Sequence, residues 1–248
     1  GSPTRPVRPR RRMSAPAVTL APGVVRIPTM RDFINSYAFV DEDGQVTLVD
    51  CGLKKAPAKI VKGLAAIGKR PADVTRIILT HAHTDHAGGA AAMLSSTGVA
   101  GVDIHAADVE FVEVGHWPPT DQSTTAGRLF SRMPGATFAP ATVASVLHDG
   151  DLLPVAGGLR VIHTPGHTPG HVLLLHEPSG VLITGDAIFN MAWGMRWPLS
   201  AVCTSYRQNK QSAHALGELD YQLAAFTHGP EIRDNARESI RGFLRAKS

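Results

Sequence analysis

Four side chains that can bind metal ions lie within six residues of one another, in the segment THAHTDHAGG at residues 80–89. They are His81, His83, Asp85 and His86. His81 and His83 are two residues apart, so on an extended chain they point to the same side. Asp85 and His86 follow where we expect the chain to turn into a helix, and they can aim at a second point close by. This spacing predicts that one short segment supplies ligands to two adjacent metal ions.

Such a centre needs further ligands, and three other segments place a histidine or an aspartate just after an expected strand. His167 follows the strand LRVIH in the segment TPGHTPGH, Asp186 follows a strand in LITGDAIF, and His228 follows one in AAFTHGP. Side chains at neighbouring strand ends converge on one edge of a sheet. We therefore expect these three residues to join the cluster at residues 80–89.

The elements that must position these ligands are indicated by hydrophobic periodicity and by turn residues. The first half begins with a hairpin that turns at Asp43-Gly44, and the strand VTRIILT delivers the histidine segment. Residues 115–140 are rich in Pro, Gly, Ser and Thr, which indicates a long surface loop, either a lid or a variable insertion. The second half repeats the mixture of strands and helices and ends in a helix with Pro230 in its first turn. Further helices are expected at 55–71, 87–97, 107–115 and 204–219, and further strands at 102–106, 158–163, 171–176, 181–185 and 221–228.

The motifs HxHxDH, TPGHTPGH, TGD and HG occur in this order between residues 81 and 228. They resemble the metal-binding motifs of the metallo-β-lactamase superfamily. The resemblance implies an α/β (α+β) fold, a four-layer αβ/βα sandwich in which two mixed β-sheets pack face to face with helices outside. It also implies two zinc ions, with iron or manganese as alternatives, since the ligands are mostly nitrogen and include no cysteine. His171, the second histidine of TPGHTPGH, is not a metal ligand in this family, so we expect it to contact a ligand residue instead. Matched motif by motif, one metal would be held by His81, His83 and His167, the other by Asp85, His86 and His228, and Asp186 would bridge them.

The resemblance implies a hydrolase that uses a hydroxide held between two metals, with Asp85 as the catalytic residue that orients it. HxHxDH with an aspartate at position 186 is similar to glyoxalase II-like thioesterases and to lactonases, so an ester, thioester or lactone is the expected substrate. Only 20 residues follow His228, so we expect the extra C-terminal domain of glyoxalase II to be missing. Phe189 stands where the lactonases have a tyrosine. The alternatives are a mononuclear iron persulfide dioxygenase, a member that hydrolyses β-lactams or phosphodiesters, and a binding protein without turnover, which the complete ligand set disfavours.

Aromatic side chains follow the third motif closely, in the segment FNMAWGMRWPLS. A segment so near the metals is a candidate to line the substrate pocket, and the substrate would then have a hydrophobic part. Ordinary core packing is the alternative. Candidate pocket residues are Phe189, Trp193 and Trp197 in this segment, and His116 and Trp117 in the long loop.

The net charge of +4 comes from one end of the 248-residue chain. Residues 1–12 hold five arginines and no acidic residue, and without them 20 basic residues face 21 acidic ones, a net charge of −1. We therefore expect a small-molecule substrate and no nucleic-acid partner, with residues 1–14 as a disordered basic arm or a cloning remnant before a hydrolase domain at 15–248. No apolar run of about 18 residues occurs, so no membrane span is expected. Cys51 and Cys203 form no CxxC motif, which favours reduced thiols and a cytoplasmic location. The oligomeric state stays open.

Overall fold

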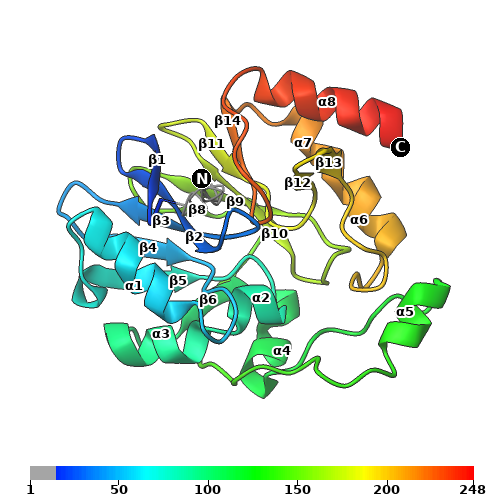
Figure 1. The fold of residues 1–248 in the computed structure, drawn as a ribbon, viewed down its shortest axis with the longest axis horizontal. Helices are drawn as coiled ribbons and strands as arrows, with labels where there is room; N and C mark the ends of the chain where they lie inside the picture. Colours follow the sequence, from blue (N-terminus) through cyan, green and yellow to red (C-terminus); the bar gives the residue numbers. More distant parts are fainter. Residues whose placement is uncertain (1–14) are drawn as a thin grey trace, which may run out of the picture.

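The computed structural model describes residues 15–248, so the arm expected at residues 1–14 lies outside the described residues. The strands form a seven-stranded sheet, a five-stranded sheet and a separate two-stranded hairpin. Helices cover the outer faces of the two large sheets (Figure 1). This arrangement confirms the predicted sandwich of two mixed sheets with helices outside. Within residues 15–248, every helix falls short of the length and apolarity that crossing a membrane requires.

The seven-stranded sheet follows the order of the sequence, from β1 to β7. Its first four strands pair antiparallel, and β4 to β7 pair parallel. The predicted hairpin is confirmed, since Val40 pairs with Val46 across a turn in which Gly44 has a φ of 86°. The strands are β1 (Val18–Ala21), β2 (Val24–Met30), β3 (Ile34–Val40), β4 (Val46–Val49), β5 (Val74–Ile78), β6 (Val102–His105) and β7 (Val143–Leu147).

The five-stranded sheet has the order β14-β11-β10-β9-β8. Only β11 and β14 pair parallel in it, and the other neighbours are antiparallel. The chain leaves β11 and forms the β12–β13 hairpin before it reaches the helices of the second half. The strands are β8 (Leu152–Leu153), β9 (Leu159–His163), β10 (Val172–His176), β11 (Val181–Ile183), β12 (Phe189–Met191), β13 (Gly194–Arg196) and β14 (Leu223–Ala225).

Three hydrophobic clusters hold the layers together. The first lies between the seven-stranded sheet and its helices and includes Leu48 and Ile77. The second lies between the two sheets and includes Phe39 and Leu174, and the third includes Phe226 beneath the helices of the second half. Full burial of such a side chain stabilises the fold by about 1.5–3 kcal/mol. The helices are α1 (Pro57–Ala66), α2 (Thr84–Ala87), α3 (Ala90–Thr97), α4 (Val109–Val114), α5 (Thr125–Phe130), α6 (Tyr206–Ala213), α7 (Ala215–Glu218) and α8 (Ala236–Lys247), with 3-10 turns η1 (Pro71–Asp73) and η2 (Ala106–Asp108).

Two expected details differ from the structure. Pro230 does not begin the last helix, because the chain beyond it runs alongside β14, where Ile232 and Ala224 exchange two backbone hydrogen bonds. Helix α8 begins only after Asn235, which has a φ of 52°. The long loop at 115–140 contains the short helix α5, which the Thr124 side chain caps by accepting a hydrogen bond from the backbone of Gly127. Figure 1 shows α5 extending away from the two sheets.

Candidate metal centre

The residues of the HxHxDH motif lie directly beyond the end of β5. His81 lies in a bend between β5 and α2, rather than on the extended strand end that we expected, whereas His83, directly before α2, has an extended backbone. Asp85 and His86 lie on α2, as the sequence suggests. The start of the helix therefore divides the four side chains into two pairs, and each pair belongs to a different group of potential metal ligands.

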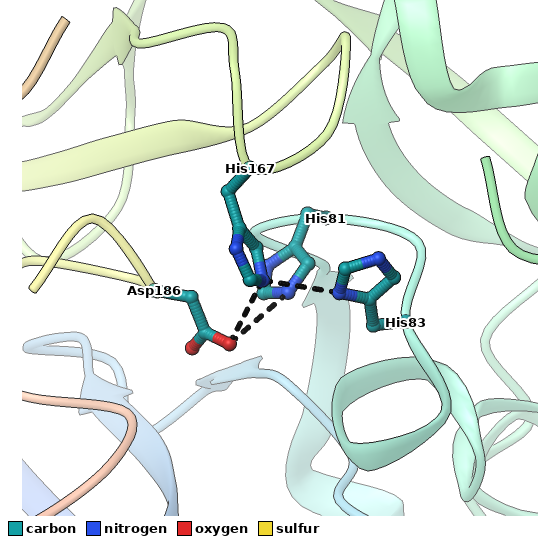
Figure 2. Close-up of side chains that lie close together, drawn as sticks. All are labelled: His81, His83, His167 and Asp186. Carbon is teal, nitrogen blue, oxygen red and sulfur yellow. Dashed lines mark hydrogen bonds and ion pairs between the residues drawn. The ribbon is translucent and has the colours of Figure 1, made fainter. Parts of the chain in front are cut away.

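The first group of potential ligands contains His81, His83, His167 and Asp186, and all four are buried. The Nδ1 atom of His83 lies 3.0 Å from Nε2 of His167. Oδ2 of Asp186 lies 3.1 Å from Nε2 of His167 and 3.5 Å from Nε2 of His81. Figure 2 shows these side chains converging from the bend after β5, from the loop between β9 and β10, and from the segment after β11.

The second group contains Asp85, His86, His228 and, again, Asp186. Nε2 of His228 lies 2.9 Å from Oδ2 of Asp85 and 3.2 Å from Oδ2 of Asp186. Nε2 of His86 lies 3.2 Å from Oδ1 of Asp186. The structure thus brings together all seven residues that the motifs predict as ligands, and Asp186 is the member that both groups share.

Several ring nitrogens at the centre of these groups have no hydrogen-bond partner. Among residues 15–248, this holds for the buried Nε2 atoms of four ligand histidines, and three of these atoms lie within 3.5 Å of an oxygen of Asp186. The four are His81, His83, His86 and His228, and all but His83 belong to the three. Leaving a buried polar atom unpaired costs about 1–3 kcal/mol, so three such atoms around one carboxylate need an explanation. Imidazole nitrogens and carboxylate oxygens are ligands that zinc and related cations bind. The buried donor set therefore fits divalent metal ions.

The opposite ring nitrogen of four ligand histidines has a partner of its own. The Thr80 hydroxyl lies 3.0 Å from Nδ1 of His81. The Asp50 carboxylate lies 2.8 Å from Nδ1 of His86, and the Phe33 backbone carbonyl lies 2.9 Å from Nδ1 of His228. The sulfur of Cys203 lies 3.5 Å from Nδ1 of His167. Contacts of this kind fix the tautomer and the orientation of a metal-binding imidazole.

Asp50 follows β4 and anchors the histidine segment from behind. Its Oδ1 accepts the backbone N–H of Thr80 at 2.8 Å, and its Oδ2 accepts the Thr80 hydroxyl at 2.8 Å. Its backbone has a φ of 62°, a strained conformation for a residue with a side chain. Sequence reasoning missed Asp50, although an aspartate close to the end of a buried strand is the same kind of signal that pointed to Asp186.

His171 lies behind Asp186, as its expected supporting role requires. Its Nε2 accepts the backbone N–H of Asp186 at 2.8 Å, so its Nδ1 carries the hydrogen and lies 2.8 Å from the Thr164 hydroxyl. A Cβ at Gly185 would collide with Nε2 of His171, so only glycine permits this approach. The Thr227 hydroxyl donates to Oδ1 of Asp186 at 2.6 Å. Asp186 is therefore held through both its backbone and its carboxylate.

Burial and neighbouring charges divide the ligand histidines into two kinds. Burial, followed by repulsion from a neighbouring imidazole, lowers the pKa of His81 and of His83 well below the usual value. Burial also acts to lower the pKa of His86 and of His228, but nearby carboxylates, Asp186 first, outweigh it. The pKa of His228 rises to about 9, and that of His86 rises well above its usual value. The ligand histidines in turn outweigh burial at Asp186 and hold its pKa well below the usual value.

Two of the five candidate pocket residues lie against ligand histidines. The Phe189 ring packs on His228 with ring centroids 4.3 Å apart, and the Trp117 ring packs on His83 at the same separation. Phe33, which the sequence did not single out, also contacts His228, with centroids 5.0 Å apart. Aromatic side chains thus cover the outer sides of both ligand groups.

The other three candidates lie elsewhere. Trp197 contacts Phe243 of α8, and its indole N–H donates to the backbone carbonyl of Lys247 at 3.1 Å. Its proximity to Asp186 in sequence was misleading, because the β12–β13 hairpin intervenes and Trp197 docks on the last helix. Trp193, at the tip of that hairpin, is 69% exposed. His116 is also exposed, and its Nδ1 lies 2.6 Å from the backbone carbonyl of Trp117.

The fold and the buried donor set together define a metal-dependent hydrolase. The sequence model of the metallo-beta-lactamase superfamily matches residues 29–240. The chain belongs to this superfamily.

Relatives and solved structures are consistent with that membership. A probable metallo-hydrolase of Bacillus subtilis, YybB, is 26% identical over 79% of this chain and 81% of its own. A hydroxyacylglutathione hydrolase of Cereibacter sphaeroides is 31% identical over 69% of this chain, a match that covers 54% of that enzyme. A metallo-beta-lactamase family protein from Thermus thermophilus superposes with a TM-score of 0.70 at 28% identity, over 92% of this chain and 80% of its own.

Proposed function

We propose that the protein is a dinuclear zinc hydrolase for a small ester, thioester or lactone that has a hydrophobic part. The observation that carries the proposal is the position of Asp186, whose two oxygens lie within 3.5 Å of ring nitrogens from both ligand groups. A carboxylate can bridge two cations, because each oxygen offers lone pairs to a different ion. His81, His83 and His167 would hold one ion, and Asp85, His86 and His228 the other.

A pair of divalent cations, when bound, supplies Lewis acidity, since it lowers the pKa of water and withdraws charge from the oxygen of a scissile carbonyl. The chain's own residues arrange the rest of the site. Asp85 is the most exposed ligand carboxylate, with a side chain 26% accessible, whereas that of Asp186 is 3% accessible. Its pKa lies well below the usual value because His86 and His228 outweigh its burial. Asp85 is therefore ionised, and its carboxylate can accept a hydrogen bond and so orient a reacting group on the open side of the site.

The aromatic side chains support a substrate with an apolar part. Trp117 and Phe189 lie on opposite ligand groups, against His83 and His228. An acyl chain or ring bound between them would be shielded from water, which strengthens electrostatic interactions at the reacting bond. The resemblance to a hydroxyacylglutathione hydrolase, an enzyme named for a thioester substrate, supports an acyl-transfer reaction to water. The net charge of −1 outside residues 1–12 supports a small molecule over a nucleic acid.

The test combines metal analysis with a substrate screen. Protein purified without added metal is analysed for zinc, iron and manganese, and is then assayed on thioesters, lactones, simple esters, phosphodiesters and β-lactams, each with a chelator control. We expect about two zinc ions per chain and chelator-sensitive hydrolysis of esters, thioesters or lactones. One iron per chain with oxygen-dependent turnover of a glutathione persulfide would contradict the proposal, and so would a preference for β-lactams or phosphodiesters.

A further inference from the structure

Asp108 joins two ligand-bearing loops that belong to different halves of the sandwich. One of its oxygens, Oδ2, accepts the backbone N–H of Ala82 at 3.0 Å and the hydroxyl of Thr168 at 2.6 Å. The other, Oδ1, accepts the backbone N–H of Gly170 at 2.7 Å. Asp108 is 0% exposed, so these three hydrogen bonds are made without competition from water.

The partners of Asp108 are neighbours of the first ligand group in sequence. Ala82 lies between His81 and His83, and Thr168 directly follows His167. A single carboxylate thus fixes the bend after β5 relative to the loop between β9 and β10. These are the two segments whose histidines approach within 3.0 Å, from His83 Nδ1 to His167 Nε2. Within residues 15–248, the side chain of Asp108 makes no hydrogen bond to α2 or to the segment of His228, which carry the second group.

The contact between Asp108 and Gly170 is closely packed as well as hydrogen-bonded. A Cβ at Gly170 would lie 2.7 Å from the backbone nitrogen of Asp108 and 2.8 Å from its carboxyl carbon. Only a glycine therefore lets the second loop come near enough for its N–H to reach Oδ1. Three donors on one small acceptor leave that loop little freedom to shift relative to the first.

We propose that Asp108 is a positioning residue that sets the spacing of the first ligand group and thereby controls how tightly His81, His83 and His167 bind a divalent metal. The inference rests on the proposed function in taking these histidines as metal ligands. It goes further in assigning the geometry of one ligand group, and not of the other, to a residue that touches neither metal nor substrate.

The variant Asp108→Asn tests this directly. The asparagine has the same shape, but its NH₂ group is a donor and must face at least one of the three donors that the carboxylate accepts. Zinc binding is measured by competition with a chromophoric chelator, and Co²⁺ is used as a spectroscopic probe whose visible absorption reports the ligand geometry. We expect the affinity of the first group to fall by about 10- to 100-fold, while the second group retains its affinity.

Three matched variants separate positioning from a general loss of stability. Asp103→Asn alters another buried carboxylate, on the preceding strand β6, whose side chain pairs with Arg76 at 3.3 Å and bonds neither ligand loop. It is expected to lower the thermal midpoint and leave both metal affinities unchanged. Thr168→Val removes one of the three donors and is expected to weaken the first group less than Asp108→Asn does. Thr168→Ser keeps the hydroxyl and is expected to restore the wild-type affinity and Co²⁺ spectrum.

The outcomes distinguish this inference from the proposed function. If the wild-type protein binds two ions and Asp108→Asn binds both with unchanged affinity, the positioning role is wrong and the proposed function stands. Equal weakening of both groups, or equal weakening by Asp103→Asn, would also overturn the positioning role. A wild-type protein that binds neither Zn²⁺ nor Co²⁺ would overturn the proposed function, and the inference with it.

Discussion

The indole N–H of Trp117 donates a hydrogen bond to the Thr84 hydroxyl over 2.6 Å and thereby holds the long loop against the first residue of α2. This bond keeps the indole ring on His83, and Phe130 of α5 stacks behind it with centroids 5.4 Å apart. Two aromatic rings in series thus extend from a ligand histidine to the last residue of α5, within the loop. A residue that anchors a loop and also faces the site should affect substrate binding more than chemistry.

The substitution Trp117→Ala should raise KM for esters or thioesters with a long acyl chain by about tenfold, because an aromatic contact with an apolar substrate is lost. The effect on kcat should be smaller, and the KM for an acetyl ester should change little. Steady-state kinetics on a series of acyl chain lengths measures this. Trp193→Ala is the control, since that tryptophan is 69% exposed at a hairpin tip. Equal effects of the two substitutions would show that Trp117 does not contact the substrate.

Substitution of the shared carboxylate should separate folding from metal binding. In Asp186→Asn the amide oxygen can still accept the Thr227 hydroxyl, so the fold should persist. The charge that both ligand groups share is lost, so the second metal should bind more weakly and turnover should fall by several orders of magnitude. Circular dichroism, metal stoichiometry and kcat are measured together. Nearly unchanged turnover in a well-folded variant would refute the bridging role.

Metal binding should depend on pH in a direction that the pKa shifts dictate. In the metal-free protein, His228 has a pKa of about 9 and His86 one well above the usual value, so both are protonated at pH 7. A metal binds only the neutral imidazole, so an ion entering the second group must displace about two protons, one from each of these histidines. The affinity of this group should therefore rise as pH increases towards about 9. His81 and His83, with lowered pKa values, are already neutral at pH 7 and should release none.

Titration calorimetry in buffers of different ionisation enthalpy counts these protons. One metal equivalent should show a buffer-dependent heat, and the other should show a much smaller dependence. A heat that is independent of the buffer for both equivalents would mean that His86 and His228 are neutral before the metal binds.

Trp197 should contribute to stability and not to catalysis. It contacts Phe243 and donates a hydrogen bond to the carbonyl of Lys247, so Trp197→Ala loosens α8. We expect a loss of about 3 kcal/mol in the free energy of unfolding, at the lower end for a large aromatic residue because the indole is only half-buried. KM and kcat at a temperature where the variant is folded should match those of the wild type. A change in KM with acyl chain length would instead place Trp197 in the pocket.

The ligand set was predictable from the sequence because each ligand carries a local signal. Each ligand histidine or aspartate lies close to the end of a buried strand, as Asp186 lies three residues beyond β11, or in the helical turn that follows one. The strands themselves were predictable from hydrophobic runs such as VLLLH in β10. Their arrangement in two packed sheets came from the family resemblance. The order of the strands within each sheet was not predicted, although most pairings join strands that are neighbours in the chain, and β11 with β14 is the exception.

The residues that support the ligands were mostly not predictable. The carbonyl of Phe33 is a backbone atom, and no residue type marks it as the partner of His228. Asp108 is one aspartate among many, and only the folded chain brings its carboxylate to loops 26 and 60 residues away. Trp197 shows the opposite error, since closeness in sequence to Asp186 suggested a shared site that the intervening hairpin prevents.

The ligands of each group come from both halves of the sandwich, since His81 to His86 follow a strand of one sheet while Asp186 and His228 follow strands of the other. A metal ion bound by such a group would link the two sheets through its coordination bonds. With both ions bound, neither half could open without breaking those bonds, so backbone amides in β5 and β11 should exchange with solvent as one cooperative unit. When the ions are stripped, the two halves are free to loosen at separate rates.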